Sequence, residues 1–177
     1  MEAKLLNRNA VGIDINPQSI LISEKNLQFK YETVSKIHIQ QGDATSINFV
    51  KDGKIDFICM HPPYASIIKY SKDIAGDISL LSAEEFLCAM SKVASESYRV
   101  LKKGRMCAIM IGDIRCRKKV VPLGFQVMNV FLKQGFYSKE IIIKEQHNCR
   151  STDYWEKQNN DFLLLSHEYI FVFQKYE

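Results

Sequence analysis

Short apolar segments alternate with amphipathic segments along this chain, and this alternation constrains the fold more than any other feature. Four of the apolar segments have the length and composition of buried strands, at residues 10–15, 37–40, 55–60 and 105–111. Segments with helical spacing of apolar residues follow the first and the third of these strands. Such alternation indicates an α/β fold with a mainly parallel sheet.

Helix-end signals support the expected helices, which cover residues 16–30, 82–104 and 122–134. Asn16 is a good N-cap, and Pro17 suits the first helical position. Ser82 and Glu85 form a capping-box pair at the start of the long second helix. Gly104 is expected to end that helix, because glycine is the usual residue just past a helix terminus.

Two more strand-like segments, residues 139–144 and 168–173, follow with no helix between them. We therefore expect an antiparallel pair, although the connection between them is long for a hairpin. The chain has 177 residues, of which 46% are hydrophobic and 25% charged, and no linker divides it. These values predict a single globular domain over residues 1–177 and exclude a disordered tail, a collagen-like repeat and a coiled-coil rod.

The sequence also bears on the compartment and on the class of partner. It has no apolar stretch of the ~20 residues that cross a membrane, and no secretory signal at its start. Five cysteines, an odd number without a Cys-x-x-Cys pair, argue against a disulfide framework and a structural zinc site. We expect a cytoplasmic protein without a metal. The net charge of +4 permits a polyanionic partner without demanding one.

Polar or conformationally special residues close four of the expected strands, at Asp14, Asp43, residues 61–64 and Asp113. Ligands of open α/β sheets bind at the carboxyl ends of the strands. Asp14 could accept hydrogen bonds from the two hydroxyls of a ribose, and Asp43 from the amino group of a purine. Either could instead be a turn carboxylate. Two such acids on neighbouring strands favour an adenosine-like ligand.

The segment His61-Pro62-Pro63-Tyr64 is the most distinctive one in the chain. Two prolines directly after a buried strand fix the backbone and remove two N–H donors, which leaves carbonyl oxygens free. A planar base with an exocyclic amine could stack on Tyr64 and donate to His61 and to the Pro62 carbonyl. A rigid loop that only packs Tyr64 on the core is the alternative.

Taken in order, residues 11–17, 41–44, 61–64 and 167–173 resemble the S-adenosylmethionine-dependent DNA amino-methyltransferases, enzymes of DNA methylation and restriction–modification. The resemblance implies a Rossmann-like sheet, mostly parallel with an antiparallel C-terminal strand. It also implies methyl transfer from S-adenosylmethionine to adenine N6 or cytosine N4, on a base that is flipped out of the duplex.

The resemblance assigns roles to particular residues. The matched cofactor-binding positions are Asp14 and Ile15 for the ribose side, and Asp43 and Ala44 for the adenine. The matched catalytic positions are His61, Pro62, Pro63 and Tyr64. These residues would orient the amine for in-line attack on the methyl group, without a covalent enzyme intermediate.

Two features depart from the family pattern. His61 stands where the family has Asp, Asn or Ser, and only a neutral imidazole can accept a hydrogen bond. The family's glycine-rich cofactor loop is absent, because the chain contains no Gly-x-Gly and only thirteen residues precede Asp14. Residues 2–8 resemble the helix that normally follows that loop. The first strand of the fold is therefore expected to be missing.

Three arrangements could compensate for the missing strand. The strands at residues 10–15 and 55–60 could pair directly, a second copy of the chain could supply a strand, or an upstream polypeptide could complete the sheet. Two other functions also stay open: a truncated or degenerate copy that at most binds nucleic acid, and a methyltransferase that acts on RNA or a small molecule.

Basic residues near the expected site predict DNA contacts. They are Lys69 and Lys72, after the Pro-Pro-Tyr segment, and Arg115, Arg117, Lys118 and Lys119, in the loop after the strand at residues 105–111. A solvated charge run is the alternative interpretation. Residues 147–150 and 154–155, in the long late connection, could touch the target base or its neighbours.

Overall fold

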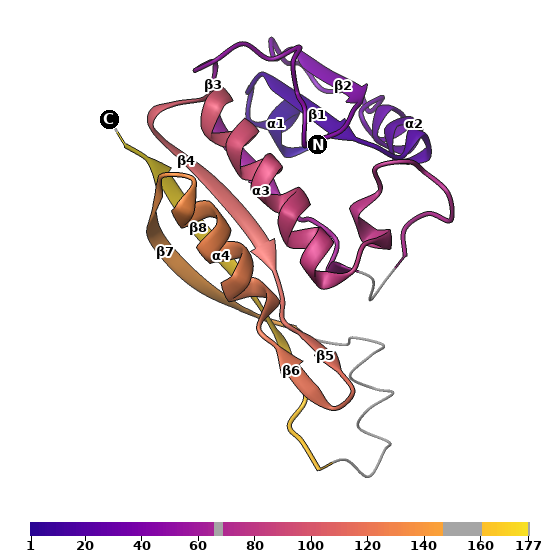
Figure 1. The fold of residues 1–177 in the computed structure, drawn as a ribbon. Helices are drawn as coiled ribbons and strands as arrows, with labels where there is room; N and C mark the ends of the chain where they lie inside the picture. The colour runs from indigo at the N-terminus through magenta and orange to yellow at the C-terminus, as the bar shows by residue number, and fades with distance from the viewer. Residues whose placement is uncertain (66–68, 147–160, 177) are drawn as a thin grey trace.

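Helices and strands alternate along the chain as the sequence predicts (Figure 1). The computed structural model describes residues 1–65, 69–146 and 161–176. Its elements are α1 (Glu2–Leu5), β1 (Ala10–Asp14), α2 (Pro17–Asn26), β2 (Ile37–Gln41), β3 (Ile55–Met60), the 3-10 helix η2 (Ile78–Leu80), α3 (Ala83–Val100), β4 (Leu101–Ile111), β5 (Ile114–Cys116), β6 (Lys119–Val121), α4 (Leu123–Lys133), β7 (Phe136–Glu145) and β8 (His167–Lys175). Among the described residues, no helix has both the length and the apolar character to cross a membrane.

The strands confirm the predicted α/β class. β1 and β2 pair in parallel, and a four-stranded sheet has the order β3-β4-β8-β7. β3 and β4 are parallel, whereas β8 is antiparallel to both β4 and β7. β7 therefore runs in the same direction as β4, and β8 is the antiparallel C-terminal strand that the sequence indicated.

β1 and β3 do not pair with each other. β1 is bonded along one edge to β2, and β3 along one edge to β4, so the two parallel pairs belong to separate sheets. In the part of the chain that the structure describes, no strand occupies the other edge of either. Direct pairing of these two strands, one of the three arrangements considered from the sequence, is thus not adopted.

Helix caps agree with the sequence, with one correction. The Asn16 side chain accepts from the Gln18 amide at 2.9 Å, and Ser82 and Glu85 make both bonds of a capping box. Gly104 does not end α3, contrary to the prediction. α3 ends at Val100, and β4 starts at the next residue because Leu101 already pairs with Ile55 of β3. The prediction for Gly104 was therefore wrong: its φ of 69° lies within β4, where the register with β3 shifts.

The core lies between the four-stranded sheet and two helices, α3 and α4, which cover one of its faces (Figure 1). α3 buries one stripe, and α4 packs Phe131 against Phe173 of β8, with ring centroids 5.2 Å apart. Fully buried large side chains include Phe86, Phe131, Phe171, Phe173, Met90, Ile109 and Leu123. This apolar burial fixes the carboxyl ends of β3 and β4 relative to the amino end of the antiparallel strand β8.

A hairpin of β5 and β6 follows β4, where the sequence predicted a loop. Arg117 and Lys118 form its turn, and both have positive φ, 49° and 67°. Neither is a residue that signals a tight turn, so composition alone did not indicate the hairpin.

Candidate functional site

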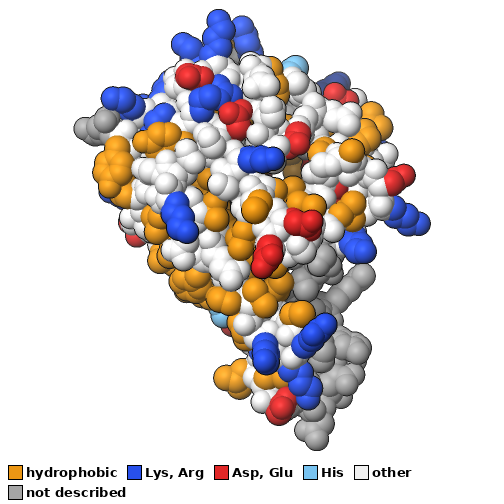
Figure 2. Space-filling model, in the orientation of Figure 1, with side chains coloured by type: hydrophobic (Ala, Val, Ile, Leu, Met, Phe, Trp, Pro, Cys, Tyr) orange, Lys and Arg blue, Asp and Glu red, His pale blue; other side chains and the backbone are white. Residues whose placement is uncertain are grey.

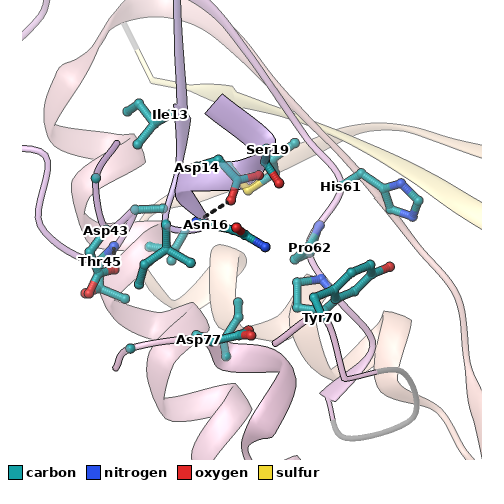
Figure 3. A pocket seen from close by; sticks show the side chains of 18 of the residues that line it. Ile13, Asp14, Asn16, Ser19, Asp43, Thr45, His61, Pro62, Tyr70 and Asp77 are labelled. Carbon is teal, nitrogen blue, oxygen red and sulfur yellow. Dashed lines mark hydrogen bonds between the residues drawn. The ribbon is translucent and has the colours of Figure 1, made fainter. Parts of the chain in front are cut away.

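A cavity of about 490 Å³ lies at the carboxyl ends of β1, β2 and β3 (Figure 3). Its lining includes Asp14, Ile15, Asn16, Ser19, Asp43, Ala44, Thr45, His61, Pro62, Pro63, Tyr70 and Asp77. The lining also includes Ile13 of β1, Met60 of β3, and Met90 and Val93 of α3. The cavity therefore extends between β1 and β3, which do not pair with each other. The volume falls in the range of small-molecule sites.

Asp14 lies at the end of β1 and is exposed to the cavity. One carboxylate oxygen, Oδ1, accepts from the backbone amide of Asn16 at 2.8 Å, and the side chain of Asn16 in turn caps α2. This local chain of hydrogen bonds fixes the direction of the Asp14 side chain. Figure 3 shows Asp14, Asn16 and Ser19 on one side of the cavity and His61 on the other, with its ring turned away from them. Ile15 lines the cavity beside Asp14.

Asp43 follows β2 and faces the cavity together with Ala44. Its Oδ1 accepts from the Thr45 amide at 2.8 Å, which is the local turn bond considered as the alternative to ligand binding. Gly76 lies next to it, and a Cβ there would be 3.4 Å from Asp43 Oδ2 and 2.8 Å from Ile15 Cδ1. Gly76 also has a φ of 86°. A side chain at this position would therefore be strained and would crowd both groups.

Asp77 is a site residue that sequence reasoning missed. It is 7% exposed, caps η2 through the Ser79 amide at 2.8 Å, and accepts from Ser71 Oγ at 2.5 Å. Burial opposes its ionisation, but these hydrogen bonds outweigh burial and lower the pKa of its carboxyl. Asp77 thereby shapes the loop that forms one wall of the cavity. The pattern Gly76-Asp77-Ile-Ser79 is a turn signal that could have indicated it.

The Pro-Pro segment lines the cavity, but the tyrosine that follows it does not. His61, Pro62 and Pro63 are in the lining, whereas Tyr64 packs against the core and is half-buried. In the described residues, no backbone hydrogen bond outside the helices and strands reaches the Pro62 carbonyl. Ala65, directly after the tyrosine, is 1% exposed and has a φ of 48°, which is a strained conformation for this residue.

The Tyr64 hydroxyl donates to Glu168 of β8, a second site residue that sequence reasoning missed. Glu168 is 5% exposed and also accepts from Lys144 of β7 at 2.5 Å. His61 joins the group, because its Nε2 lies 3.0 Å from the tyrosine oxygen. A charged residue within the apolar segment 167–173 was a visible signal, since an acid is rarely buried unless it is paired.

The ionisation of this group follows from its environment. Burial raises the pKa of Tyr64 well above its ordinary value, and the hydrogen bond to Glu168 and the charge of Glu168 add to this rise. Burial opposes the ionisation of Glu168, but the bonds from Lys144 and Tyr64 and the charge of Lys144 outweigh it and lower the pKa of Glu168. At neutral pH, therefore, Tyr64 is neutral and Glu168 is a carboxylate.

The basic residues predicted to contact DNA fall into two regions. Arg117, Lys118 and Lys119 are exposed on the β5–β6 hairpin, where Figure 2 shows blue side chains at the end of the molecule. Arg115 is half-buried, because its guanidinium donates to the Leu163 carbonyl at 2.8 Å and lies over the Phe162 ring. Lys69 is exposed and directly precedes Tyr70, which lines the cavity. Residues 147–150 and 154–155 lie outside the described residues.

Comparison with known proteins gives a family and a relative. The family model of the N6/N4 methyltransferases, described as DNA methylase, matches residues 55–177. A release factor glutamine methyltransferase of Clostridium acetobutylicum is 27% identical over 133 residues, which cover 72% of this chain and 44% of that protein. The chain thus spans less than half the length of this curated relative.

Solved structures share the fold. A candidate DNA modification methylase of Thermus thermophilus, complexed with S-adenosyl-L-methionine, has a TM-score of 0.58 at 23% identity, covering 77% of this chain and 54% of that one. A SAM-dependent methyltransferase of Methanosarcina mazei has a TM-score of 0.64 at 15% identity, covering 97% and 84%. The predicted Rossmann-like methyltransferase fold is confirmed.

Proposed function

The chain belongs to the DNA methylase family, and on that basis we propose that it transfers a methyl group from S-adenosylmethionine to the exocyclic amine of adenine (N6) or cytosine (N4) in DNA. The main support is that one cavity brings two strand-end acids, Asp14 and Asp43, together with the His61-Pro62-Pro63 segment. A methyltransferase must hold the cofactor and the acceptor amine side by side, and this cavity offers a group for each.

The residues on the β1 and β2 side fit the cofactor. A carboxylate at the end of a strand suits the two ribose hydroxyls, and Asp14 is oriented for this by the Asn16 amide. Asp43 and Ala44 would meet the adenine, while Ile15 adds apolar contact. When bound, the cofactor supplies a methyl group on a positively charged sulfur, which is activated for transfer to nitrogen. Both acids are acceptor groups that suit the neutral donors of an adenosine.

The residues on the β3 side would hold the target base. His61 and the Pro62 carbonyl would accept the two hydrogens of the amine, which directs the nitrogen lone pair towards the methyl group. The rigid Pro62-Pro63 backbone holds these acceptors in place. Tyr64 does not line the cavity, so a base stacked on its ring would lie at the cavity rim. Flipping the base out of the duplex brings it there.

DNA would be held by the exposed cations of the β5–β6 hairpin and by Lys69, next to the cavity. Arg117, Lys119 and Lys69 are exposed and would bind phosphates, and a phosphate would compete with Asp161 for Lys118, whose Nζ lies 3.5 Å from Asp161 Oδ1. Arg115 contributes by holding the hairpin on residues 162–163. Phosphate contacts of this kind set position on the duplex and carry no base specificity. A DNA substrate also agrees with the cytoplasmic location expected from the sequence.

We also propose that a further strand fills the space between β1 and β3, supplied by a second copy of the chain or by polypeptide outside these 177 residues. Both strands run in parallel pairs and each has an edge without a strand partner in the described residues. Val11 and Phe57 on these strands are 44% and 55% exposed. An added strand would pair both edges and cover apolar surface. A monomeric mass in light scattering would exclude the second copy as the source, and a dimeric mass would support it.

Binding and transfer experiments test the main proposal. Calorimetry of the chain with S-adenosylmethionine should show binding, and Asp14→Asn should weaken it. Labelled methyl transfer is then measured on duplex DNA, RNA, a small amine and a peptide with the glutamine of a release factor. A glutamine amide also presents a planar NH₂ group, and the curated relative is named for that acceptor. Label in DNA alone supports the proposal. Label in another acceptor, or no binding and no transfer, contradicts it, and the latter favours a non-catalytic copy.

A further inference from the structure

Four polar side chains from three parts of the fold form a continuous chain of contacts beside the cavity. His61 and Tyr64 follow β3, Glu168 lies on β8, and Lys144 on β7. His61 Nε2 is 3.0 Å from Tyr64 Oη, Tyr64 Oη contacts Glu168 Oε1, and Glu168 Oε2 is 2.5 Å from Lys144 Nζ. Only His61 lines the cavity. The other three therefore connect to the cavity through His61.

The direction of these hydrogen bonds is set from the Glu168 end. Glu168 is 5% exposed, and its register partner across β7 is Lys144, so the carboxylate and the ammonium are held together by the sheet. Beside an ammonium at 2.5 Å the carboxylate is ionised. An ionised carboxylate can only accept hydrogen bonds. The contact between Tyr64 and Glu168 must then use the hydroxyl proton of Tyr64.

The hydroxyl of Tyr64 has one proton to donate, and this fixes the direction of its hydrogen bond with His61. Because that proton is donated to Glu168, the Tyr64 oxygen can only accept from His61. The His61 nitrogen that faces it is Nε2, which must therefore carry a hydrogen. The space for this arrangement is made by Gly112, where a Cβ would lie 3.2 Å from Tyr64 Cε2 and 3.6 Å from Glu168 Cγ.

We propose that Glu168 and Tyr64 are positioning residues that fix the tautomer of neutral His61, with the proton on Nε2 and the lone pair on Nδ1. The hydrogen bond at one ring nitrogen decides which nitrogen is free to accept. Nδ1 has no hydrogen-bond partner among the described residues, and the side chain is 48% exposed. Nδ1 is thus the atom that accepts the substrate amine, a role that rests on the proposed function. Lys144 keeps Glu168 ionised and so sets the direction of the hydrogen bonds from His61 to Tyr64 and from Tyr64 to Glu168.

The ring nitrogens of His61 report this tautomer directly. We would label the full chain with ¹⁵N-histidine and record long-range ¹H–¹⁵N spectra at a pH where the ring is neutral. The sequence has four histidines, and the spectrum of His61→Gln assigns the resonances of His61 by their loss. Protonated and unprotonated ring nitrogens resonate far apart, so the ratio of the two forms can be read without any enzymatic activity.

Wild type should show a single tautomer with the proton on Nε2. Tyr64→Phe keeps the ring and removes the hydroxyl, so its His61 should become a mixture of both tautomers. Tyr137→Phe, at the far end of β7, is the matched control and should leave the spectrum of His61 unchanged. Glu168→Gln can donate to Tyr64 through its amide, and should shift the population towards the Nδ1–H form.

Two results would overturn the proposal: a wild-type ring protonated on Nδ1, or an identical tautomer ratio in wild type and Tyr64→Phe. If Tyr64→Phe does not fold, an unchanged ratio in Glu168→Gln overturns it equally. Methyl transfer is measured separately. A chain that shows the predicted tautomer and its loss in Tyr64→Phe, yet methylates no acceptor, contradicts the proposed function and supports the role of Glu168 and Tyr64.

Discussion

Replacing Lys144 by methionine should destabilise the protein much more than the same change at Lys102, although both lysines bind a carboxylate. Their side chains are similarly exposed, at 46% and 43%. Their partners differ, because the side chain of Glu168 is 7% exposed and that of Asp56 is 60% exposed. Lys102 even has the richer geometry, with bonds of 2.8 and 2.9 Å to both oxygens of Asp56. The pair of variants separates burial of the acid from hydrogen-bond geometry.

The expected loss at Lys144 is about 2 kcal/mol of unfolding free energy. A hydrogen bond to a charged group contributes ~1.5–3 kcal/mol, and a buried carboxylate left without its cation adds a further cost. Lys144 is itself about half exposed, so solvent screens part of the interaction and keeps the value near the lower end. The Lys102–Asp56 pair is screened more strongly, because its carboxylate is exposed to solvent, and its loss should be small.

The loss of unfolding free energy in Lys144→Met should depend on pH. In wild type the pKa of Glu168 is lowered, so Glu168 stabilises the fold above its unfolded pKa and this contribution is lost as pH falls through the folded value. In Lys144→Met the burial of Glu168 remains while the cation is gone, so its pKa rises. Lys144→Met should therefore lose the full ~2 kcal/mol of unfolding free energy at pH ~8. The difference in unfolding free energy between wild type and the variant should become smaller at lower pH, where Glu168 of the variant is protonated.

Urea unfolding followed by circular dichroism at about pH 8 and pH 5 measures this. Similar losses of unfolding free energy in Lys144→Met and Lys102→Met at the higher pH would refute the role given to the burial of Glu168. A deficit at Lys144 that does not change between the two pH values would refute it as well, because the cost would then not come from the ionised Glu168.

Three further predictions concern the proposed activity. Asp14→Asn should weaken S-adenosylmethionine binding about tenfold or more in calorimetry, because a charged acceptor is lost while the bond to the Asn16 amide can persist; an unchanged Kd would remove Asp14 from the site. Replacing Arg117 and Lys118 together by glycine should weaken DNA binding and reduce the slope of log affinity against log salt concentration by about two units. Glycine adopts the positive φ of both positions without strain, so the stability of the protein should not fall. Single-turnover methylation should fall in His61→Phe, since phenylalanine keeps a planar ring but has no acceptor nitrogen; an unchanged rate would exclude His61 as the acceptor.

Features that depend on neighbours in sequence were readable without the structure. The alternation of strands and helices, the caps at Asn16 and Ser82, and the acids that close β1 and β2 are all local patterns, and the structure places the predicted cofactor residues in one cavity. The family followed from motifs of the same local kind. Gly104 shows the limit, because a local helix stop was overruled when Leu101 paired with β3.

What only the tertiary structure decided involves residues that are distant in the chain. Tyr64 and Glu168 are 104 positions apart, and neither segment by itself shows that the tyrosine hydroxyl meets this buried acid of β8. The separation of β1 from β3 is likewise a property of the assembled sheet. The sequence by itself determined most of the helices and strands and the acids that close β1 and β2, because capping and periodicity act within a few residues, but it did not indicate the β5–β6 hairpin. The structure decided which side chains meet, since such contacts depend on how the strands are ordered and packed.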